Sequence, residues 1–479
     1  MNVQPLGGGV TRRIPRRKLV QQTAACALLG GLALGACGTR TRSPHPTAQA
    51  PVVTVTFQPF FISLSGSLLS SAQKLATEAL GQFAQEGGSK GIRIQMALFQ
   101  STDTNIAAMT SGSGPDVVYD YSYAPYVEQK LIAPLDDFVK QDGLDLATWS
   151  AGQIAVYQRS GHLYAVPAYM GTACYAVNVS AFDQAGQPYP TADWTSDDFV
   201  KVCTEMTATV NGQTRYGGML YQWDNMIDGS RWIFNAFGGS LMSTDGTTST
   251  LSTPGSLAAG QWMFEKCYWP RICVTRSSGY WGMFGSGQLA MRTMGTWELF
   301  GSLQSYQNMK WTLLPFPIFP AGRATFSTDD FWALNARSKH PREAWEVMKW
   351  ASAGTYWNTF NMKMQLLSPA RVDLWDQWIY VVEAAAPPLK GKGLQWYADA
   401  AQKGYALAPL YYKYNDPQAE DAVGGVINAL YTKSLDSVTQ GFATADNLVD
   451  AIEAAGAQAA VSSSASSSKS SATSASASG

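Results

Sequence analysis

The sequence is poor in the residues from which most metal and catalytic centres are built. Histidine occurs three times in 479 residues, at His45, His162 and His340, in unrelated contexts. The six cysteines form no Cys-x-x-Cys pair. The chain therefore has almost none of the side chains that a zinc site or a histidine-based catalytic triad needs. We expect neither a metal nor a cofactor.

Charge is scarce as well. Charged residues make up 14% of the chain and the formal net charge is −1, so there is no basic field to attract nucleic acid or an anionic membrane. Hydrophobic residues reach 46%, which argues against global disorder. A chain of 479 residues is also too long for one small core, and two or more lobes are expected.

A long apolar run is lacking too, since the stretch 24–36 is too short to cross a bilayer comfortably. It follows five basic residues between Arg12 and Lys18 and ends in Leu-Gly-Ala-Cys at Cys37. This order predicts an export signal over 1–37, with a transmembrane anchor as the alternative. Leu-Gly-Ala-Cys resembles the lipobox of bacterial lipoproteins, which implies that Cys37 is acylated and tethers the mature chain to the outer face of the cell membrane. Arg16-Arg17 also resembles a twin-arginine signal, so the export route stays open.

Two further segments lie outside the expected core. Residues 38–51 are rich in Thr and Pro and poor in apolar residues, as a linker between anchor and body would be. Residues 456–479 are dominated by Ser and Ala and cannot bury a core. We expect them to form a disordered tail.

Four cysteines remain beyond the anchor: Cys174, Cys203, Cys267 and Cys273. Outside the cell disulfides persist, and four cysteines permit three connectivities. Cys267 and Cys273 flank a short loop that closes easily, so they are the first disulfide candidate. The alternative is that all four are buried thiols.

Between linker and tail, strand and helix signals alternate. Residues 52–61, 91–99 and 115–121 have the character of strands, and 67–86 and 104–114 that of helices. This alternation favours βαβ units and a mostly parallel sheet. Further helices are expected at 195–207, 255–267, 341–353 and 419–431.

Several motifs follow one another in a familiar order. They are SGSGPDVVYDYSYAPYVEQKLIAPLDDFV (111–139), GHLYAVP (161–167), YAVN (175–178), WTSDDF (194–199), FGSGQLAM (284–291) with Trp297, PFP (315–317) and SKHPREAW (338–345). Each is weak alone, and their collinear order resembles the family-1 extracellular solute-binding proteins of ABC importers, among them the maltose- and oligosaccharide-binding proteins. The resemblance covers roughly residues 52–455.

The resemblance implies an α/β, periplasmic-binding-protein-like fold with two discontinuous lobes, a hinge and an interlobe cleft. We expect lobe 1 at 52–166 plus 326–372 and lobe 2 at 167–325 plus 373–455. A carbohydrate ligand would bind in the cleft by hinge closure. The other implied partners are the ABC permease subunits and, through the anchor, the membrane, with the protein acting as a monomer and not as an enzyme.

Sugars combine hydroxyls with apolar C–H faces, so their sites need flat rings together with carboxylates or amides. Phe60 follows the first strand, Asp120 and Tyr123 follow the strand of PDVVYD, and Tyr169 lies near Gly171 where the chain first crosses between lobes. By resemblance these loops face the cleft. Burial in the core is the alternative for Phe60, and the polar side chain that the family often has near Gly171 is missing here.

The later ligand candidates are Trp223, Asn225, Asp228, Trp297, Glu298, Asp329, Asp330 and Trp332. Residues 221–232 alternate rings with hydrogen-bonding groups, although a solvated loop would do the same. Trp297 aligns with the tryptophan that stacks on sugar in maltose-binding relatives, and burial in the core is its alternative. Asp329 and Asp330 stand where the family usually has Gly-Gly, so they suit hydroxyls or a cationic ligand, or else a helix cap or surface turn.

Two alternative functions remain. The same scaffold takes up polyol phosphates, polyamines or metal ions in some relatives, but arginines near the cleft motifs are few and histidines are missing. A surface-anchored glycoside hydrolase would need two carboxyls facing each other across a bond. The adjacent pairs 136–137, 197–198 and 329–330 do not normally face one another in that way, and the first sits at an expected helix start.

Overall fold

The computed structural model describes residues 52–60, 66–83, 85, 91–220, 231–274, 279–328, 330–407, 411–414 and 416–475. The predictions for the signal at 1–37, for Cys37 and for the linker at 38–51 lie outside the described residues. The same holds for Trp223, Asn225, Asp228 and Asp329.

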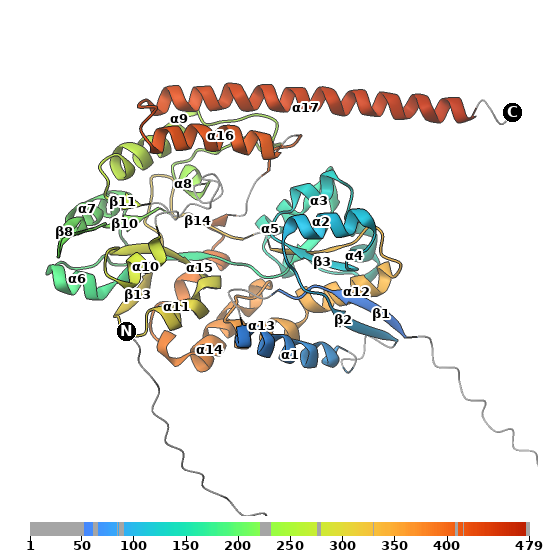
Figure 1. The fold of residues 1–479 in the computed structure, drawn as a ribbon, viewed down its shortest axis with the longest axis horizontal. Coiled ribbons are helices and arrows are strands. Elements are labelled where there is room, and N and C mark those ends of the chain that lie inside the picture. Colours follow the sequence, from blue (N-terminus) through green and yellow to red (C-terminus); the bar gives the residue numbers. More distant parts are fainter. Residues whose placement is uncertain are drawn as a thin grey trace, which may run out of the picture. The chain divides into compact units, whose positions relative to one another are not determined.

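The first sheet has five strands in the order β2-β1-β3-β15-β6 (Figure 1). Its strands are β1 Val53–Phe57, β2 Ile92–Met96, β3 Val117–Asp120, β6 Ala165–Pro167 and β15 Phe331–Leu334. β1 pairs in parallel with β2 and β3, as the alternating strand and helix signals predict. β15 returns from far along the chain and pairs antiparallel with both β3 and β6, which makes this sheet mixed.

The second sheet is antiparallel, which corrects the expectation of mostly parallel pairing. Its order is β12-β7-β13, with β7 Ala173–Asn178, β12 Met291–Gly295 and β13 Trp311–Leu314. Every residue of β7 and β12 is buried. Four short ladders complete the strands: β4 Gln158–Arg159 with β5 His162–Leu163, β8 Ala208–Val210 with β9 Gln213–Arg215, β10 Gly218–Met219 with β11 Cys273–Val274, and β14 Thr325–Phe326 with β16 Ala406–Leu407.

Helices surround these sheets (Figure 1). The α-helices are α1 Gly66–Gln82, α2 Thr102–Ser111, α3 Ala124–Glu128, α4 Asp136–Asp142, α5 Ala151–Val156, α6 Val179–Ala185, α7 Ser196–Met206, α8 Arg231–Ala236, α9 Pro254–Gln261, α10 Tyr280–Gly285, α11 Leu299–Ser305, α12 Pro341–Ala353, α13 Thr355–Gln365, α14 Trp375–Ala385, α15 Gln395–Gln402, α16 Asp416–Tyr431 and α17 Val438–Ala475. α9 runs on as a π-helix, η2 Trp262–Tyr268, and the 3-10 turns are η1 Leu146–Thr148, η4 Thr296–Glu298, η5 Val372–Leu374 and η6 Pro387–Leu389.

Adjacent aspartates stand at two helix starts. Asp136 and Asp137 form the first turn of α4, as predicted. Asp198 forms a capping box with Thr195 at the start of α7, and the hydrogen bonds from Thr195 lower the pKa of the Asp198 carboxyl. The Asp198 carboxylate thus accepts from the Thr195 N–H at the start of α7, and Asp136 Oδ1 accepts from Leu163 N (3.3 Å).

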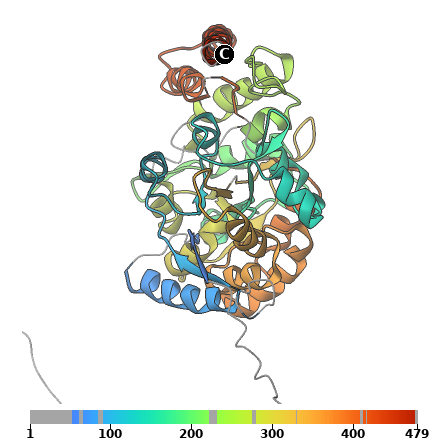
Figure 2. The ribbon, with the colours of Figure 1, turned by 90° about the vertical axis from the view of Figure 1, so that its right-hand side faces the viewer.

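The long C-terminal helix differs from the expected tail. α16 and α17 lie side by side in both views (Figures 1 and 2), and α17 continues as helix through the Ser/Ala stretch to Ala475. Alanine is the strongest helix former, so this composition is compatible with helix even without a core to pack on. Within the described residues, no helix is both long and apolar enough for a membrane span.

The chain passes from the first sheet to the second through residues 168–172, between β6 and β7, and returns through 327–330, between β14 and β15. These two crossover segments are hydrogen-bonded to each other. Ala168 N donates to Asp330 O (2.8 Å), and Thr328 N donates to Gly171 O (2.9 Å). The exact lobe boundaries stay a prediction, and the expected boundary at 372 and 373 implies a third crossing, so movement of one sheet against the other would involve these two segments together with the chain near 372.

Candidate ligand-binding site

The paired crossover segments form the middle of the candidate site. The Gly171 amide donates to Thr328 Oγ1 (3.1 Å), and a Cβ atom on Gly171 would stand 2.8 Å from that side chain. Gln153 of α5 is buried and donates from Nε2 to both Tyr169 O and Thr328 O, each at 3.2 Å. One amide thus joins both crossovers, so their relative position is held by specific contacts rather than by packing alone.

Trp297 lies on η4, directly after the buried strand β12. Its indole ring occupies the space that a side chain on Gly295 would need, 2.4 Å from an added Cβ, and it comes within 2.8 Å of an added Cβ on Gly171. Gly295 has φ −85°, so the glycine is required here for the close approach of the ring and not for a left-handed turn. The ring also packs on Phe326, and the residue is 8% exposed in this structure.

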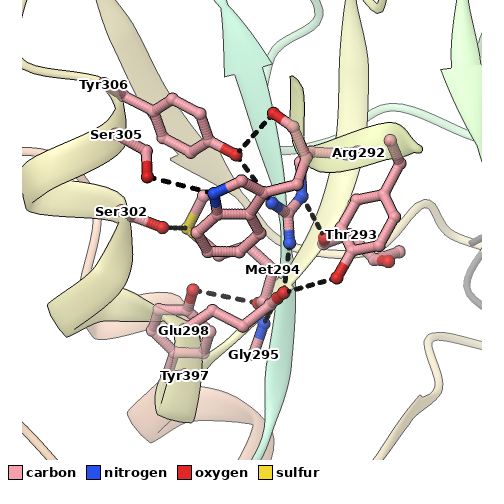
Figure 3. A network of polar contacts seen from close by, with 11 residues as sticks. Arg292, Thr293, Met294, Gly295, Glu298, Ser302, Ser305, Tyr306 and Tyr397 are labelled. Carbon is pink, nitrogen blue, oxygen red and sulfur yellow. Dashed lines mark hydrogen bonds and ion pairs between the residues drawn. The ribbon is translucent and has the colours of Figure 1, made fainter. Parts of the chain in front are cut away.

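A buried ion pair fixes the turn that carries Trp297 (Figure 3). Arg292, on β12, is fully buried, and its guanidinium contacts Glu298 Oε1 at 2.5 Å and the Tyr306 hydroxyl at 2.9 Å. The other carboxylate oxygen of Glu298 accepts from Gly295 N (2.8 Å), which closes the turn around Trp297. Burial lowers the pKa of Arg292, but Glu298, Tyr306 and Tyr280 together outweigh burial and raise it.

These contacts do not agree with the prediction that Glu298 binds the ligand. Its side chain is 7% exposed, and Oε1 also accepts from the Tyr280 hydroxyl (3.0 Å). The guanidinium of Arg292 lies 4.5 Å from the ring centre of Tyr280 and 4.6 Å from that of Trp281. The structure therefore places Glu298 in a support for Trp297, where both of its oxygens already have partners.

Asp330 ends the second crossover and is buried. Its Oδ1 accepts from the Tyr119 hydroxyl at 2.5 Å, and Thr328 and Tyr169 also donate to its carboxyl. Burial raises the pKa of Asp330 to about 6, although these hydrogen bonds act in the opposite direction. The carboxyl predicted to face the ligand is thus joined to two tyrosines, and its protonation changes near neutral pH.

A row of stacked and edge-packed rings leads from the surface to the first crossover. Tyr121 packs on Phe99 (5.8 Å between ring centres), Phe99 on Tyr119 (5.2 Å), Tyr119 on Phe60 (4.5 Å), and Phe60 stacks on Tyr169 (5.0 Å, 10° between planes). We call these five residues the aromatic row. Phe60 and Tyr169 are buried at its inner end, whereas Tyr121 is 54% exposed at its outer end.

Tyr123 was predicted from the sequence as the ligand-binding tyrosine of this loop, and Tyr121 was not. Tyr123 is buried, with its hydroxyl donating to Tyr157 O (2.8 Å) and its ring packed on Phe331. Asp120 is also buried and accepts from Thr102 Oγ1, from the amides of Tyr121 and Ser122, and from the Tyr126 hydroxyl. Burial raises its pKa against those bonds. Period-two alternation would put Tyr119, Tyr121 and Tyr123 on one face, so it gives no signal that singles out Tyr121.

One further expectation is corrected. Trp332 lies on β15, which is paired on both sides, is fully buried, and donates from Nε1 to Gln58 O (2.9 Å), so it belongs to the core of the first sheet. Cys267 and Cys273 are free, buried thiols in this structure, as Cys203 is, so the disulfide candidate between them stays a prediction. The sulfur of Cys273 lies 4.0 Å from that of Cys203 and also contacts the Cys267 thiol. Within the described residues, His, Cys, Asp and Glu side chains form no group suited to a metal ion.

This structure resembles several known solute-binding proteins. The structure is similar to an ABC substrate-binding protein of Listeria monocytogenes in complex with cycloalternan, at 18% identity and a TM-score of 0.66, covering 83% of this chain and 98% of that one. The cyclic alpha-maltosyl-1,6-maltose binding protein of Arthrobacter globiformis is similar at 18% identity and a TM-score of 0.68, with 84% and 99% covered. UgpB of Mycobacterium tuberculosis, in complex with glycerophosphocholine, is similar at 20% identity and a TM-score of 0.65, with 84% and 98% covered.

Identities this low show the fold alone, which is the two-lobe, periplasmic-binding-protein-like fold expected from the sequence. The model of the bacterial extracellular solute-binding proteins matches residues 65–353, more than half of the chain. The motif order read from the sequence and the paired crossovers of the structure agree with this match. The chain therefore belongs to the bacterial extracellular solute-binding protein family.

Proposed function

We propose that this protein is the substrate-binding component of an ABC importer and captures an oligosaccharide between its two lobes. Membership in an extracellular solute-binding family supports an extracytoplasmic location. Cys37 would carry the lipid anchor, and the ligand-loaded protein would act as a monomer that delivers its cargo to a permease. Neither step involves a reaction catalysed by this chain.

The aromatic row is the observation that carries the choice of ligand. It presents an exposed ring, Tyr121, and continues through edge-packed and stacked rings to Tyr169 in the first crossover. Flat rings match the C–H faces of sugar residues, and the hydroxyls of Tyr119 and Tyr169 with the Asp330 carboxyl supply hydrogen-bonding groups beside them. Because Phe60, Tyr119 and Tyr169 are buried in this structure, a rotation at the hinge would be needed to bring them to a chain of sugar units.

The similar structures agree with this class of ligand. Two of them are named for binding cycloalternan and a cyclic maltosyl-maltose, and others for mannotriose and maltotriose. One is named for glycerophosphocholine, so a phosphodiester is the ligand class to test against sugars. The described residues near the aromatic row include two buried carboxyls, Asp120 and Asp330, which would oppose a phosphate rather than bind it.

Release and capture would use the paired crossovers as the hinge. Trp297, held by the Arg292–Glu298 pair, stands beside Gly171 and so beside the hinge itself. A small rotation about residues 168–172 and 327–330 would change the exposure of the indole face. We propose that the indole face exposed by this rotation stacks on the ligand, as implied by the resemblance of the Trp297 motif to that of the maltose-binding proteins.

The test is a panel of oligosaccharides, monosaccharides and glycerophosphocholine, screened by thermal shift and by tryptophan fluorescence, with calorimetry for any hit. We expect an oligosaccharide to raise the melting temperature. Tyr121→Ala should weaken binding of that sugar roughly tenfold without lowering the melting temperature of the unliganded protein. Tyr380→Ala is the matched control, because Tyr380 is 76% exposed on α14 and lies outside the aromatic row. A thermal shift with glycerophosphocholine alone would contradict the proposal.

A further inference from the structure

Three of the four cysteines of the mature chain meet in the core of the segment 196–274. Cys203 lies on α7, Cys267 lies near the end of η2, and Cys273 begins β11. All three are buried thiols in the structure. The sulfur atoms of Cys203 and Cys273 are 4.0 Å apart, and the Cys267 thiol also contacts that of Cys273.

The approach of these two sulfurs depends on a pair of glycines. Gly218 is the register partner of Cys273 in the parallel ladder of β10 and β11. A Cβ atom on Gly218 would stand 2.6 Å from the sulfur of Cys203 and 3.4 Å from that of Cys273. On Gly217 it would stand 2.1 Å from the carbonyl oxygen of Cys203. The missing side chains therefore let α7 lie against this strand, with the Cys203 sulfur in the space beside Cys273.

We propose that Cys203 and Cys273 form a disulfide that links α7 to β11 in the exported protein. A separation of 4.0 Å is van der Waals contact, and the bond would require the sulfurs to approach to about 2.05 Å. The proposal rests on the proposed function only for the location outside the cytoplasm, where disulfides persist.

The oxidant is a disulfide of a small thiol or of a thiol–disulfide oxidoreductase. The thiolate of Cys273 attacks one sulfur of that disulfide and expels the other as a thiolate, which gives a mixed disulfide. The thiolate of Cys203 then attacks the Cys273 sulfur and expels the second external thiolate. Two protein thiols lose two protons and two electrons, and one external disulfide becomes two thiols.

Burial and contact among the three thiols shift their pKa values in the folded protein. Burial acts to raise its pKa, but the thiols of Cys203 and Cys267 face its sulfur and lower the pKa to about 6. Burial raises the pKa values of the Cys203 and Cys267 thiols, and their contact with Cys273 raises them further. Because all three are buried, the bond must form while the chain folds and resist reductants until the chain is unfolded.

The experiment maps the cysteines of the full-length protein purified from the cell envelope. The protein is alkylated with iodoacetamide in denaturant without a reductant, digested, and examined by mass spectrometry. We expect a linked peptide pair containing Cys203 and Cys273, with Cys174 and Cys267 alkylated. Four alkylated cysteines, or a link between Cys267 and either neighbour, would overturn the proposal.

Three cysteine variants distinguish the effect of the disulfide on the melting temperature from the effect of core packing. Reduction in denaturant followed by refolding with a reductant should lower the melting temperature of the wild type by roughly 5–10 °C, since the bond closes a long loop. The same treatment should change neither Cys203→Ala nor Cys273→Ala, whereas Cys267→Ala should respond as the wild type does. An equal response in Cys203→Ala would contradict the assignment. The mapping needs no ligand, so its failure and a failure to bind sugar are separate results.

Discussion

Gly295 and Trp297 are two residues apart, and the ring of Trp297 lies 2.4 Å from the position that a Cβ atom of Gly295 would occupy. A methyl group at 295 must therefore displace the indole or the strand beneath it. Gly295→Ala should destabilise the protein by roughly 1–3 kcal/mol and change its tryptophan emission. It should also weaken ligand binding, because Trp297 moves. Gly282→Ala is the control, since no atom lies within 4 Å of an added Cβ there. Equal behaviour of the two variants would contradict this geometry.

The buried pair Arg292–Glu298 gives a second prediction. Arg292→Met leaves the Glu298 carboxylate buried without its cation, which should cost roughly 3–5 kcal/mol of unfolding free energy. The double variant Arg292→Met with Glu298→Leu should recover part of that loss. Urea unfolding followed by fluorescence measures both. Lys310→Met is the comparison, because the Lys310–Asp183 pair is exposed and its removal should change stability little. A loss below about 1 kcal/mol in Arg292→Met would show that the pair is not needed.

The Asp330 carboxyl gives a prediction about pH. Its pKa is raised from 3.8 to about 6 by burial, so between these values the folded protein holds a proton that the unfolded chain releases. The stability that this proton confers amounts to ~3 kcal/mol. It is present at pH 4 and is lost as the pH rises through 6. Asp330→Asn should flatten this part of the pH dependence and raise the melting temperature at pH 7.5.

The measurement is a series of melting curves from pH 4 to 8 for the wild type, for Asp330→Asn and for Asp193→Asn. Asp193 is exposed, so its variant should follow the wild-type curve. Parallel curves for the wild type and Asp330→Asn would show that Asp330 titrates at an ordinary pKa.

Gln153 joins the two crossovers through Tyr169 O and Thr328 O, and its removal should loosen them. Gln153→Ala leaves two buried carbonyls without this donor, at a cost of roughly 1–3 kcal/mol. Hydrogen exchange should then accelerate at the amides of Gly171 and Thr328, which are bonded within the pair. Gln187→Ala, at an exposed position, should leave these amides protected. Unchanged exchange in Gln153→Ala would mean that packing alone holds the crossovers.

The sequence was informative wherever a short-range rule decides the outcome. The helices at α7 and α12, the parallel trio β1–β3 and the two-lobe fold follow from capping residues, periodicity and motif order. Side-chain direction was harder to predict. Tyr121 and Tyr123 are two residues apart in a loop, and no rule of composition says which ring stays exposed. The partners of Cys273 and Glu298 come from the packing of segments, which a one-dimensional pattern does not contain.

The insertion of β15 between β3 and β6 has a consequence for biosynthesis. β7, β12 and β13 all precede Phe331, so the antiparallel sheet can be complete along the growing chain before the five-strand sheet is. Until residues 331–334 arrive, β3 and β6 have unpaired edges, which are surfaces for aggregation. A chain terminated shortly before Phe331 should thus be a ready client for a chaperone or a protease, although it already contains every strand of the other sheet.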